Sequence, residues 1–337
     1  MKKEIITIKN IDLSDRTYIF TFEPIISQMV RSVREIGLIN PPILEQISDQ
    51  PIYRIVSGLK RILALKHLKK ESADAYIFTT ENKQPNLNLF LMNFYENISI
   101  RGLNLIEKSI FLNKLLTKFE VSRETIINDY LKLLEYGSNE KVLDILLPLI
   151  KLEDNLKCAV VEDFLSPDLA VSLLNYSHDD REAVYEFYSK LKLGKNRQKE
   201  FLRLLDDIAH IQQRSIYDII HDPLIESILK DEFLTVSQKV GRIRDVLRKM
   251  RFPKFLKAEE TFSEMKKQLK LPPSIILRPP PYFENDKFSM EIIFRNQTEF
   301  DKALKIMNKI SENEMLNQLD SLIKWATNHI HRTKFLF

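Results

Sequence analysis

The sequence predicts an α+β protein that is mostly helical, with a small α/β domain, a central helical domain and a C-terminal αββα domain. Strand and helix patterns alternate over residues 1–102, which is typical of an α/β architecture. From residue 103 onward the apolar residues follow a helical period almost without interruption. Proline-bounded segments then give the order helix, strand, strand, helix. We therefore expect domains at residues 1–102, 103–252 and 253–337.

Length and composition are those of an ordinary globular protein. The 337 residues suffice for two or three domains, and 44% of them are hydrophobic and 29% charged. The 51 basic and 47 acidic residues do not by themselves identify a nucleic-acid binder. The one cysteine, Cys158, excludes an intramolecular disulfide and a cysteine-rich zinc site. Since no run is apolar enough to span a membrane and residues 1–6 lack a signal-peptide core, we expect a cytoplasmic protein.

Short strands and helices are expected to alternate in the first domain. The helix before Gly37 begins near Pro24, in agreement with the preference for proline in a first turn and glycine after a last one. The Pro41-Pro42 pair forces an extended segment into the next strand. Strands are expected at residues 3–8, 43–44, 53–56 and 73–79, and helices at residues 24–36, 59–70 and 86–98.

The junction after the strand at residues 53–56 has the features of a phosphate-binding turn. Ser57 is a candidate N-cap, because its hydroxyl can accept a hydrogen bond from a first-turn amide. Gly58 lets a ligand approach the backbone closely. Lys60 and Arg61 lie in the first turn of the helix, where free N–H groups and the helix dipole favour an anion. The alternative is a plain strand-to-helix junction with solvated basic side chains, since short motifs often match by chance.

Three segments in this order resemble the N-terminal domain of the ParB chromosome- and plasmid-partitioning family. They are the Gly37-x-x-x-Pro41 turn, the box from Ser57 to Arg61, and Glu96-Asn97 followed by Leu103-Asn104 and Glu107. The resemblance covers roughly residues 1–120 and becomes weaker beyond them. It implies a domain that binds CTP with Mg²⁺ and acts as a nucleotide-gated sliding clamp on DNA.

The resemblance also implies a role for each matching residue. The turn would shape the cytidine side, the box would hold the triphosphate, and the acid of the third segment would bind the metal ion. Arg101 is adjacent to Ile100, where the family usually has an arginine. The residues implied at the nucleotide are Gly37, Pro41, Ser57, Gly58, Lys60, Arg61, Glu96, Asn97 and Arg101, with Glu96 as the metal ligand.

The box departs from the family pattern at two positions. Leu59 stands where the family has a Glu after the glycine, and Leu63 replaces the last Arg. The family uses that Glu in hydrolysis. We therefore expect binding without efficient turnover, so that the chain is at most a slow CTPase.

The central domain is expected to contain a degenerate helix-turn-helix unit, which ParB proteins have at this place. Residues 104–147 give the order helix, helix, glycine-containing turn, helix. The last of these helices carries Glu140 and Asp144 against Lys141, and residues 139–163 hold three lysines against six acids. Such a surface disfavours DNA phosphates, so we expect no palindromic operator to be recognised.

Two later segments are strongly basic and are the candidates for DNA contact. Residues 190–203 hold six basic residues against one acid, and residues 239–257 hold eight against one. A solvated helix face is the usual meaning of such a pattern, but a face of one sign also suits a nucleic-acid backbone. We expect weak, sequence-independent binding through Lys195, Arg197, Arg242, Arg244, Arg248, Lys249 and Arg251.

The C-terminal order helix, strand, strand, helix, with a final helix at residues 315–325, is similar to the dimerising domain of ParB proteins and implies a homodimer. Two functions then remain open. One is a nucleoid-associated, CTP-binding protein of chromosome or plasmid partition. The other is a regulatory or protein-interaction module of the same fold without specific DNA recognition. Sulfiredoxin shares the fold, but it needs a cysteine beside its phosphate loop, and Cys158 is far from that loop in sequence.

Overall fold

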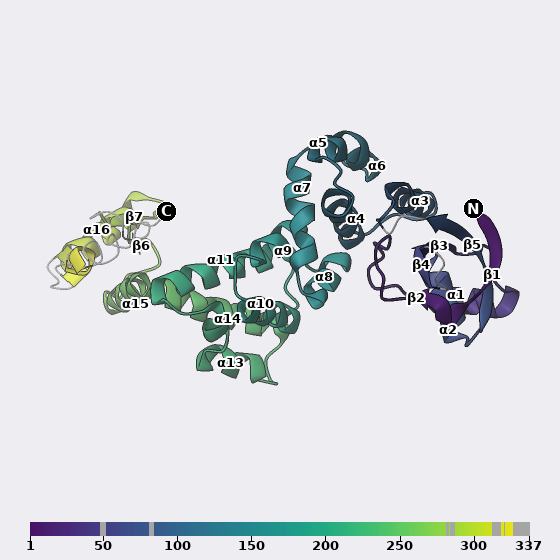
Figure 1. Cartoon of the computed structure of the whole chain (residues 1–337). Helices are drawn as coiled ribbons and strands as arrows, with labels where there is room; N and C mark the ends of the chain where they lie inside the picture. Colours follow the sequence, from purple (N-terminus) through teal and green to yellow (C-terminus); the bar gives the residue numbers. More distant parts are fainter. Residues whose placement is uncertain are drawn as a thin grey trace. The chain divides into compact units, whose positions relative to one another are not determined.

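The structure is a computed structural model that describes residues 1–47, 52–80, 84–280, 283, 287–311, 318–319 and 321–325. The chain divides into two compact units, Met1–Ser177 (unit 1) and His178–Phe337 (unit 2), whose elements are labelled in Figure 1. The division into three domains stays a prediction.

A five-stranded mixed sheet organises the first part of unit 1. Strand β3 lies in its middle, parallel to β5 and antiparallel to β4. Strand β2, which pairs with β4, was not predicted because two residues are too few to show a period. The strands are β1 (Lys2–Thr7), β2 (Ile11–Asp12), β3 (Ile43–Ile47), β4 (Tyr53–Ser57) and β5 (Ser72–Thr80), in the order β1-β5-β3-β4-β2.

Helices α1 (Ser27–Ile36) and α2 (Leu59–His67) contact each other and lie side by side in Figure 1. The apolar face of α2 is buried against the sheet, where Leu59 and Ile62 join Leu44 and Ile55 in one cluster. Between the two helices a second cluster includes Val33. Burial of apolar side chains stabilises a fold by about 25 cal/mol per Å². The contacts of both clusters therefore hold the start of α2 against the sheet. The short helix η1 (Ile8–Asn10) follows β1.

An aromatic cluster joins the end of the sheet region to the helices that follow it. Phe20 lies in the loop before α1, Phe90 and Phe94 lie on α3 (Leu87–Ile98), and Phe111 lies on α4 (Leu105–Thr117). All four are buried, and the rings of Phe94 and Phe111 stack with centroids 4.0 Å apart. Stacked aromatic pairs add about 0.5–1.5 kcal/mol to area burial, so α3 and α4 are held firmly to each other.

The rest of unit 1 is helical. The second helix of the expected helix-turn-helix order is present as α5 (Arg123–Thr125), the π-helical segment η2 (Ile126–Tyr130) and α6 (Leu131–Leu133). The elements after it are α7 (Lys141–Leu146), η3 (Leu147–Lys151), α8 (Asp154–Val161) and α9 (Pro167–Leu173).

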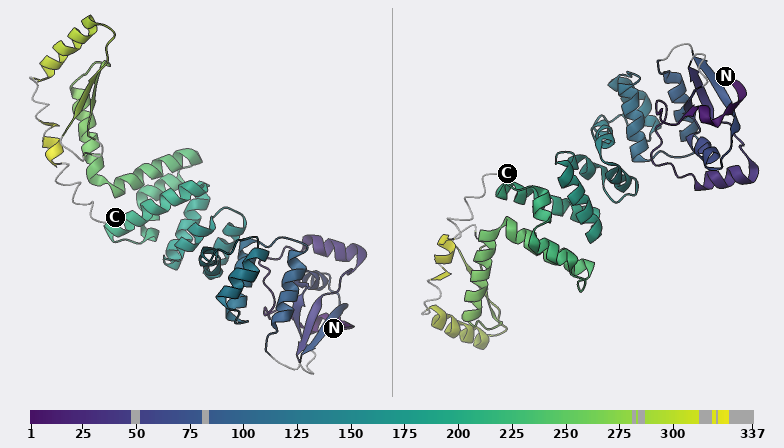
Figure 2. Two further views of the ribbon diagram at one scale, coloured as in Figure 1. Left: turned by 90° about the horizontal axis from the view of Figure 1, so that it is seen from above. Right: turned by 60° about the horizontal axis from the view of Figure 1, so that its bottom comes forward.

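Unit 2 is helical up to a small two-stranded sheet. Its helices are α10 (His178–Leu191), α11 (Lys195–Gln212), α12 (Ile216–Ile220), α13 (Pro223–Lys230), α14 (Val236–Arg251) and α15 (Pro253–Gln268). Strands β6 (Ile275–Arg278) and β7 (Ser289–Ile292) pair antiparallel and precede α16 (Gln297–Ser311). Both views of Figure 2 show this hairpin beside α15. The expected element order α-β-β-α is therefore present.

The helix expected at residues 315–325 falls partly outside the described residues. Within this range residues 318–319 and 321–325 are described, and all of them are helical. Over the described part of the chain, every helix is too short or too polar to cross a bilayer.

Candidate nucleotide-binding site

Gly58 forms the turn between β4 and α2. It is the N-cap of α2 and has a left-handed backbone, with φ +94° and ψ 26°. A Cβ at this position would lie 2.8 Å from Nε of Arg61. The backbone conformation therefore favours glycine, and any larger residue would also displace the Arg61 side chain.

The prediction that Ser57 caps the helix is wrong. The left-handed Gly58 takes the cap position, and Ser57 remains the last residue of β4. Its buried hydroxyl donates a hydrogen bond to Oε2 of Glu96, at the end of α3. Ser57 thus connects the turn between β4 and α2 to the third segment of the predicted site.

Arg61 is the centre of the site and joins all three segments. Its Nη2 donates to Oε1 of Glu96 at 2.7 Å. Its Nη1 donates to the backbone carbonyls of Asn40 and Pro41, both at 3.0 Å. The side chain is only 14% exposed. The fold therefore brings the turn after α1, the start of α2 and the end of α3 to one guanidinium.

The end of α3 continues this network towards α4. The side-chain amide of Asn97 donates to the backbone oxygen and Oδ1 of Asn93, at 2.9 and 2.6 Å, and its own Oδ1 accepts from Nε of Arg101 at 3.3 Å. The two Nη atoms of Arg101 donate to the buried Glu107 at 2.6 and 2.9 Å. Such a bidentate pair is strong and directional, so Arg101 connects α3 to α4.

Two further residues of the predicted set lie at the edge of this arrangement. Gly37 ends α1 with φ +78°, and its N–H donates to the carbonyl of Val33 at 3.1 Å. Lys60 is half-buried in the first turn of α2 and, among the described residues, forms no ion pair. Lys60 can therefore turn to a ligand without leaving a described partner.

The chemistry of the site fits a metal-bound triphosphate. The first-turn amides of α2 have no partner within the helix, and with Lys60 they favour an anion. Arg61 lies beside them, paired with Glu96. The oxygens of Glu96 and Ser57 meet at one point beside it. Carboxylate and hydroxyl oxygens are hard donors of the kind that Mg²⁺ prefers.

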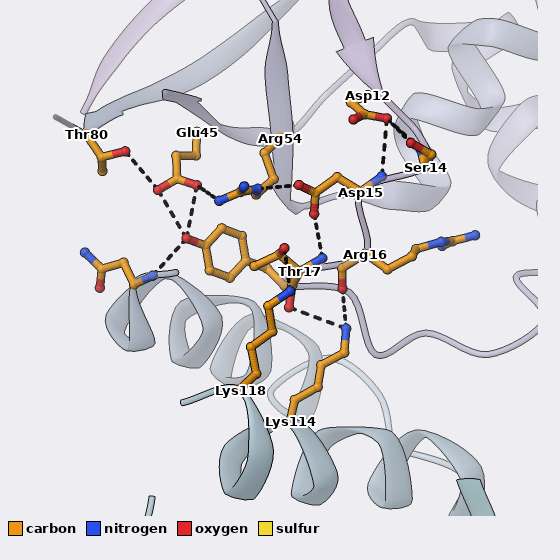
Figure 3. Close-up of polar contacts among 12 residues, drawn as sticks. Asp12, Ser14, Asp15, Arg16, Thr17, Glu45, Arg54, Thr80, Lys114 and Lys118 are labelled. Atoms are coloured by element: carbon orange, nitrogen blue, oxygen red, sulfur yellow. Dashed lines mark hydrogen bonds and ion pairs between the residues drawn. The ribbon is translucent and has the colours of Figure 1, made fainter. Parts of the chain in front are cut away.

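A second polar cluster, drawn in Figure 3, was not predicted. Its centre is Glu45, a residue of the middle strand β3. Glu45 is 0% exposed. Glu45 accepts from the hydroxyl of Tyr18 at 3.0 and 3.1 Å, from Nη1 of Arg54 at 2.9 Å and from Thr80 at 3.0 Å. Nε of Arg54 also donates to Asp15 at 2.6 Å. Burial, together with the Glu45 charge, raises the pKa of Tyr18 to about 12.

This cluster also fixes α3. The backbone N–H of Asn86, at the start of α3, donates to the hydroxyl of Tyr18 at 3.0 Å. The side chain of Asn93 donates to the Tyr18 carbonyl at 2.7 Å. Because α3 carries Glu96 at its other end, the cluster helps to position the candidate site.

Two lysines attach α4 and its C-terminal end to the loop before α1. Lys114 donates to the carbonyls of Arg16, Thr17 and Ile19, and Lys118 donates to the hydroxyl of Thr17 (Figure 3). Burial, with the positive charges of Lys118 and Arg16, lowers the pKa of Lys114 to about 8. Neither lysine was predicted, since both belong to an amphipathic helix pattern that usually faces solvent.

The basic residues predicted to contact DNA fall into two groups. On α14, Arg244 pairs with Glu200 and Arg251 pairs with Asp207, both acids of α11 at 2.6 Å. Lys249 lies 4.0 Å from Glu260 on α15. The side chains of Arg197, Arg242 and Arg248 are exposed, and Lys195 is half-buried. The first group is partly neutralised by its neighbours, so the exposed arginines carry the positive surface.

The acids of α7 also have a partner. Nε of Arg123 donates to Glu140 at 2.9 Å and its Nη2 donates to Asp144 at 2.7 Å. Arg123 lies on α5, the helix before α7. A cation that could otherwise meet a phosphate is therefore held by the acids of the would-be recognition helix.

Cys158 lies half-buried on α8. Burial, with the negative charges of Glu23 and Glu162, raises the pKa of its thiol above the ordinary value. Because the thiolate is the reactive form, Cys158 has the properties of a structural cysteine.

No family model matches the chain. A nucleoid occlusion protein of Oceanobacillus iheyensis is 25% identical over 216 residues, which cover 62% of this chain and 69% of that protein. The match supports the family resemblance that the three segments of the site predict.

Three solved structures are similar at lower identity. C-terminally truncated ParB of Caulobacter crescentus complexed with CTP-gamma-S is 20% identical, with a TM-score of 0.25, and the match covers 52% of this chain and 94% of that one. The same protein complexed to the centromeric parS site is 16% identical, with a TM-score of 0.33 and coverages of 59% and 98%. A Pnob8-like ParB-N domain is 15% identical, with a TM-score of 0.32 and coverages of 74% and 97%.

Proposed function

We propose the following function for this chain, which is a divergent member of the ParB family: it binds CTP with Mg²⁺ in unit 1 and acts as a DNA-associated clamp. The observation that carries this function is the convergence of three sequence segments on Arg61. The 25% sequence identity between this chain and a nucleoid occlusion protein supports a role at the nucleoid, in chromosome or plasmid partition or a related process. A homodimer formed through the C-terminal αββα elements is part of the same proposal.

In this function the residues of the site have separate tasks. The amides at the start of α2, with Lys60 and Arg61, bind the phosphates. Glu96 would hold the metal ion, which would supply positive charge to the triphosphate. The family resemblance implies that the segment from Gly37 to Pro41 shapes the cytidine side, and Arg61 fixes this segment through the carbonyls of Asn40 and Pro41.

Arg61→Ala is expected to weaken CTP binding by about 1.5–3 kcal/mol, which is roughly 10- to 150-fold in Kd. The substitution removes a charge-assisted phosphate contact. Titration calorimetry on the full chain with Mg²⁺ measures the Kd of CTP. Arg31→Ala, which removes an exposed arginine of α1, is the control and should leave Kd unchanged. If the unmodified protein gives no heat with any nucleoside triphosphate, the proposed nucleotide site is wrong.

Binding to DNA is expected to be weak, independent of sequence and strongly dependent on salt, because each neutralised phosphate releases a counterion. Replacing both Arg242 and Arg248 by Ala should lower the slope of log K against log salt by about 2. Replacing the paired Arg244 and Arg251 should lower it by less. Fluorescence anisotropy with a duplex of random sequence measures both slopes.

The opposite result would be a footprint on a defined DNA site that persists at high salt. That result would assign base recognition to α7 and overturn the non-specific mode of binding.

A regulatory or protein-interaction module without DNA recognition is the second candidate. It is favoured by the pairing of Arg123 with Glu140 and Asp144, which leaves α7 an acidic surface. CTP binding together with no DNA binding even at low salt would select this function over the clamp.

A further inference from the structure

On the basis of the proposed CTP site, we infer that Glu96 blocks Arg61 in the nucleotide-free protein and that a divalent cation relieves this block. Glu96 is then more than a metal ligand. It is an internal competitor of the triphosphate, and nucleotide binding depends on the metal because the metal gives Glu96 another partner.

The contacts of Glu96 use both oxygens of its carboxylate. Oε1 accepts from Nη2 of Arg61 at 2.7 Å, and Oε2 accepts from the hydroxyl of Ser57. The Arg61 side chain is 14% exposed and that of Glu96 is 30% exposed, so water screens their pairing only in part. The carboxylate therefore neutralises the guanidinium in the position where a phosphate would bind.

The remaining donors of Arg61 cannot easily replace the blocked one. Nη1 is held by the carbonyls of Asn40 and Pro41. Nε lies against Gly58, where an added Cβ would be only 2.8 Å away. A phosphate that approaches Arg61 must therefore compete with Glu96 for Nη2, and it meets the like charge of the carboxylate there.

A divalent cation changes this competition through Glu96 itself. The Ser57 hydroxyl and Oε2 of Glu96 already meet, which offers two oxygen donors at one place. When the Glu96 carboxylate pairs with a cation, it pairs less strongly with the Arg61 guanidinium. Nη2 of Arg61 then becomes available to the phosphate. Metal and triphosphate should thus strengthen each other's binding, and removal of the Glu96 charge should replace the effect of the metal.

Glu96→Gln tests this inference, because glutamine keeps the shape of the side chain and removes its charge. We would measure the Kd of CTP, and of inorganic tripolyphosphate, with excess Mg²⁺ and with excess EDTA. In EDTA the variant should bind roughly 5- to 150-fold tighter than the unmodified protein. Added Mg²⁺ should then strengthen the binding of CTP and of tripolyphosphate to this variant only slightly. Glu35→Gln, an exposed acid of α1 that pairs with Arg31, is the matched control and should behave like the unmodified protein.

The outcomes separate this inference from the proposed function. If Glu96→Gln binds in EDTA no better than the unmodified protein and merely loses the gain from Mg²⁺, Glu96 is a simple metal ligand and the inference is overturned. If neither protein binds in either buffer, the proposed CTP site is itself wrong. Glu96→Ala also removes the charge and should show the same gain in EDTA, and circular dichroism melting shows that each variant is folded.

Discussion

Saturated with CTP, the protein should release phosphate about 10²–10⁴ times more slowly than ParB proteins that carry a Glu after the glycine of the box. A carboxylate at that position can help to position or activate the attacking water, and Leu59 can do neither. In the structure Leu59 is buried in the core cluster with Ile55 and Ile62. Its position serves the packing of α2 on the sheet.

The measurement is phosphate release at saturating CTP, with and without DNA. Leu59→Met, which conserves volume, is the control for altered packing and should change neither stability nor release by much. Leu59→Glu should destabilise unit 1 without restoring turnover, since it places a carboxylate in an apolar cluster. Release at the rate of ordinary family members would show that Leu59 is irrelevant to turnover. With slow hydrolysis, a clamp would open by release of the nucleotide.

The parts of the site that the sequence predicted are the turns, which glycine and proline residues mark locally. Gly37, Pro41 and Gly58 restrict or free the backbone, so their pattern identified the turns without knowledge of the fold. Ser57 shows the limit of such patterns. Helix α2 begins one residue later than expected. Ser57 therefore contacts Glu96 of α3 and does not cap α2.

Contacts between distant segments could not be predicted in the same way. Arg61 and Glu96 were both assigned to the ligand, and only the fold shows that they bind each other. The basic face of α14 was read as a run of charges. Its partners Glu200 and Asp207 lie on α11, where a count of charges along α14 cannot include them.

The buried cluster around Glu45 was missed for a related reason. A single acid within a strand usually lies on a solvent-exposed face. Glu45 is buried because β3 is the middle strand of the sheet, and Arg54 is its direct partner on the neighbouring strand β4. Two opposite charges in paired register would have been a useful pattern, but it is visible only once the pairing is known.

Arg54→Met is expected to destabilise unit 1 by about 3–5 kcal/mol, the usual cost of removing one partner from a buried ion pair. Glu45 is fully buried and would lose the cation that it pairs with, and methionine cannot donate a hydrogen bond. Asp15 would lose the same partner. Urea unfolding of the full chain, followed by circular dichroism, measures the change. Arg31→Met removes an exposed pair with Glu35 and should cost about 0.5 kcal/mol or less.

The pH dependence provides a second test of the same substitution. Burial opposes the charged form of Asp15, but hydrogen bonds from Thr17 and Arg54 outweigh it and hold its pKa below the ordinary value. A carboxyl with a lowered folded-state pKa contributes stability that is complete above its unfolded pKa and is lost as the pH falls through the folded one. Arg54→Met should therefore lower stability most at neutral pH, and its difference from the unmodified protein should shrink in acid. A loss below about 1 kcal/mol would mean that water reaches Glu45 and that the cluster does not hold α3 in place. A loss independent of pH would mean that Arg54 does not stabilise the charged form of Asp15.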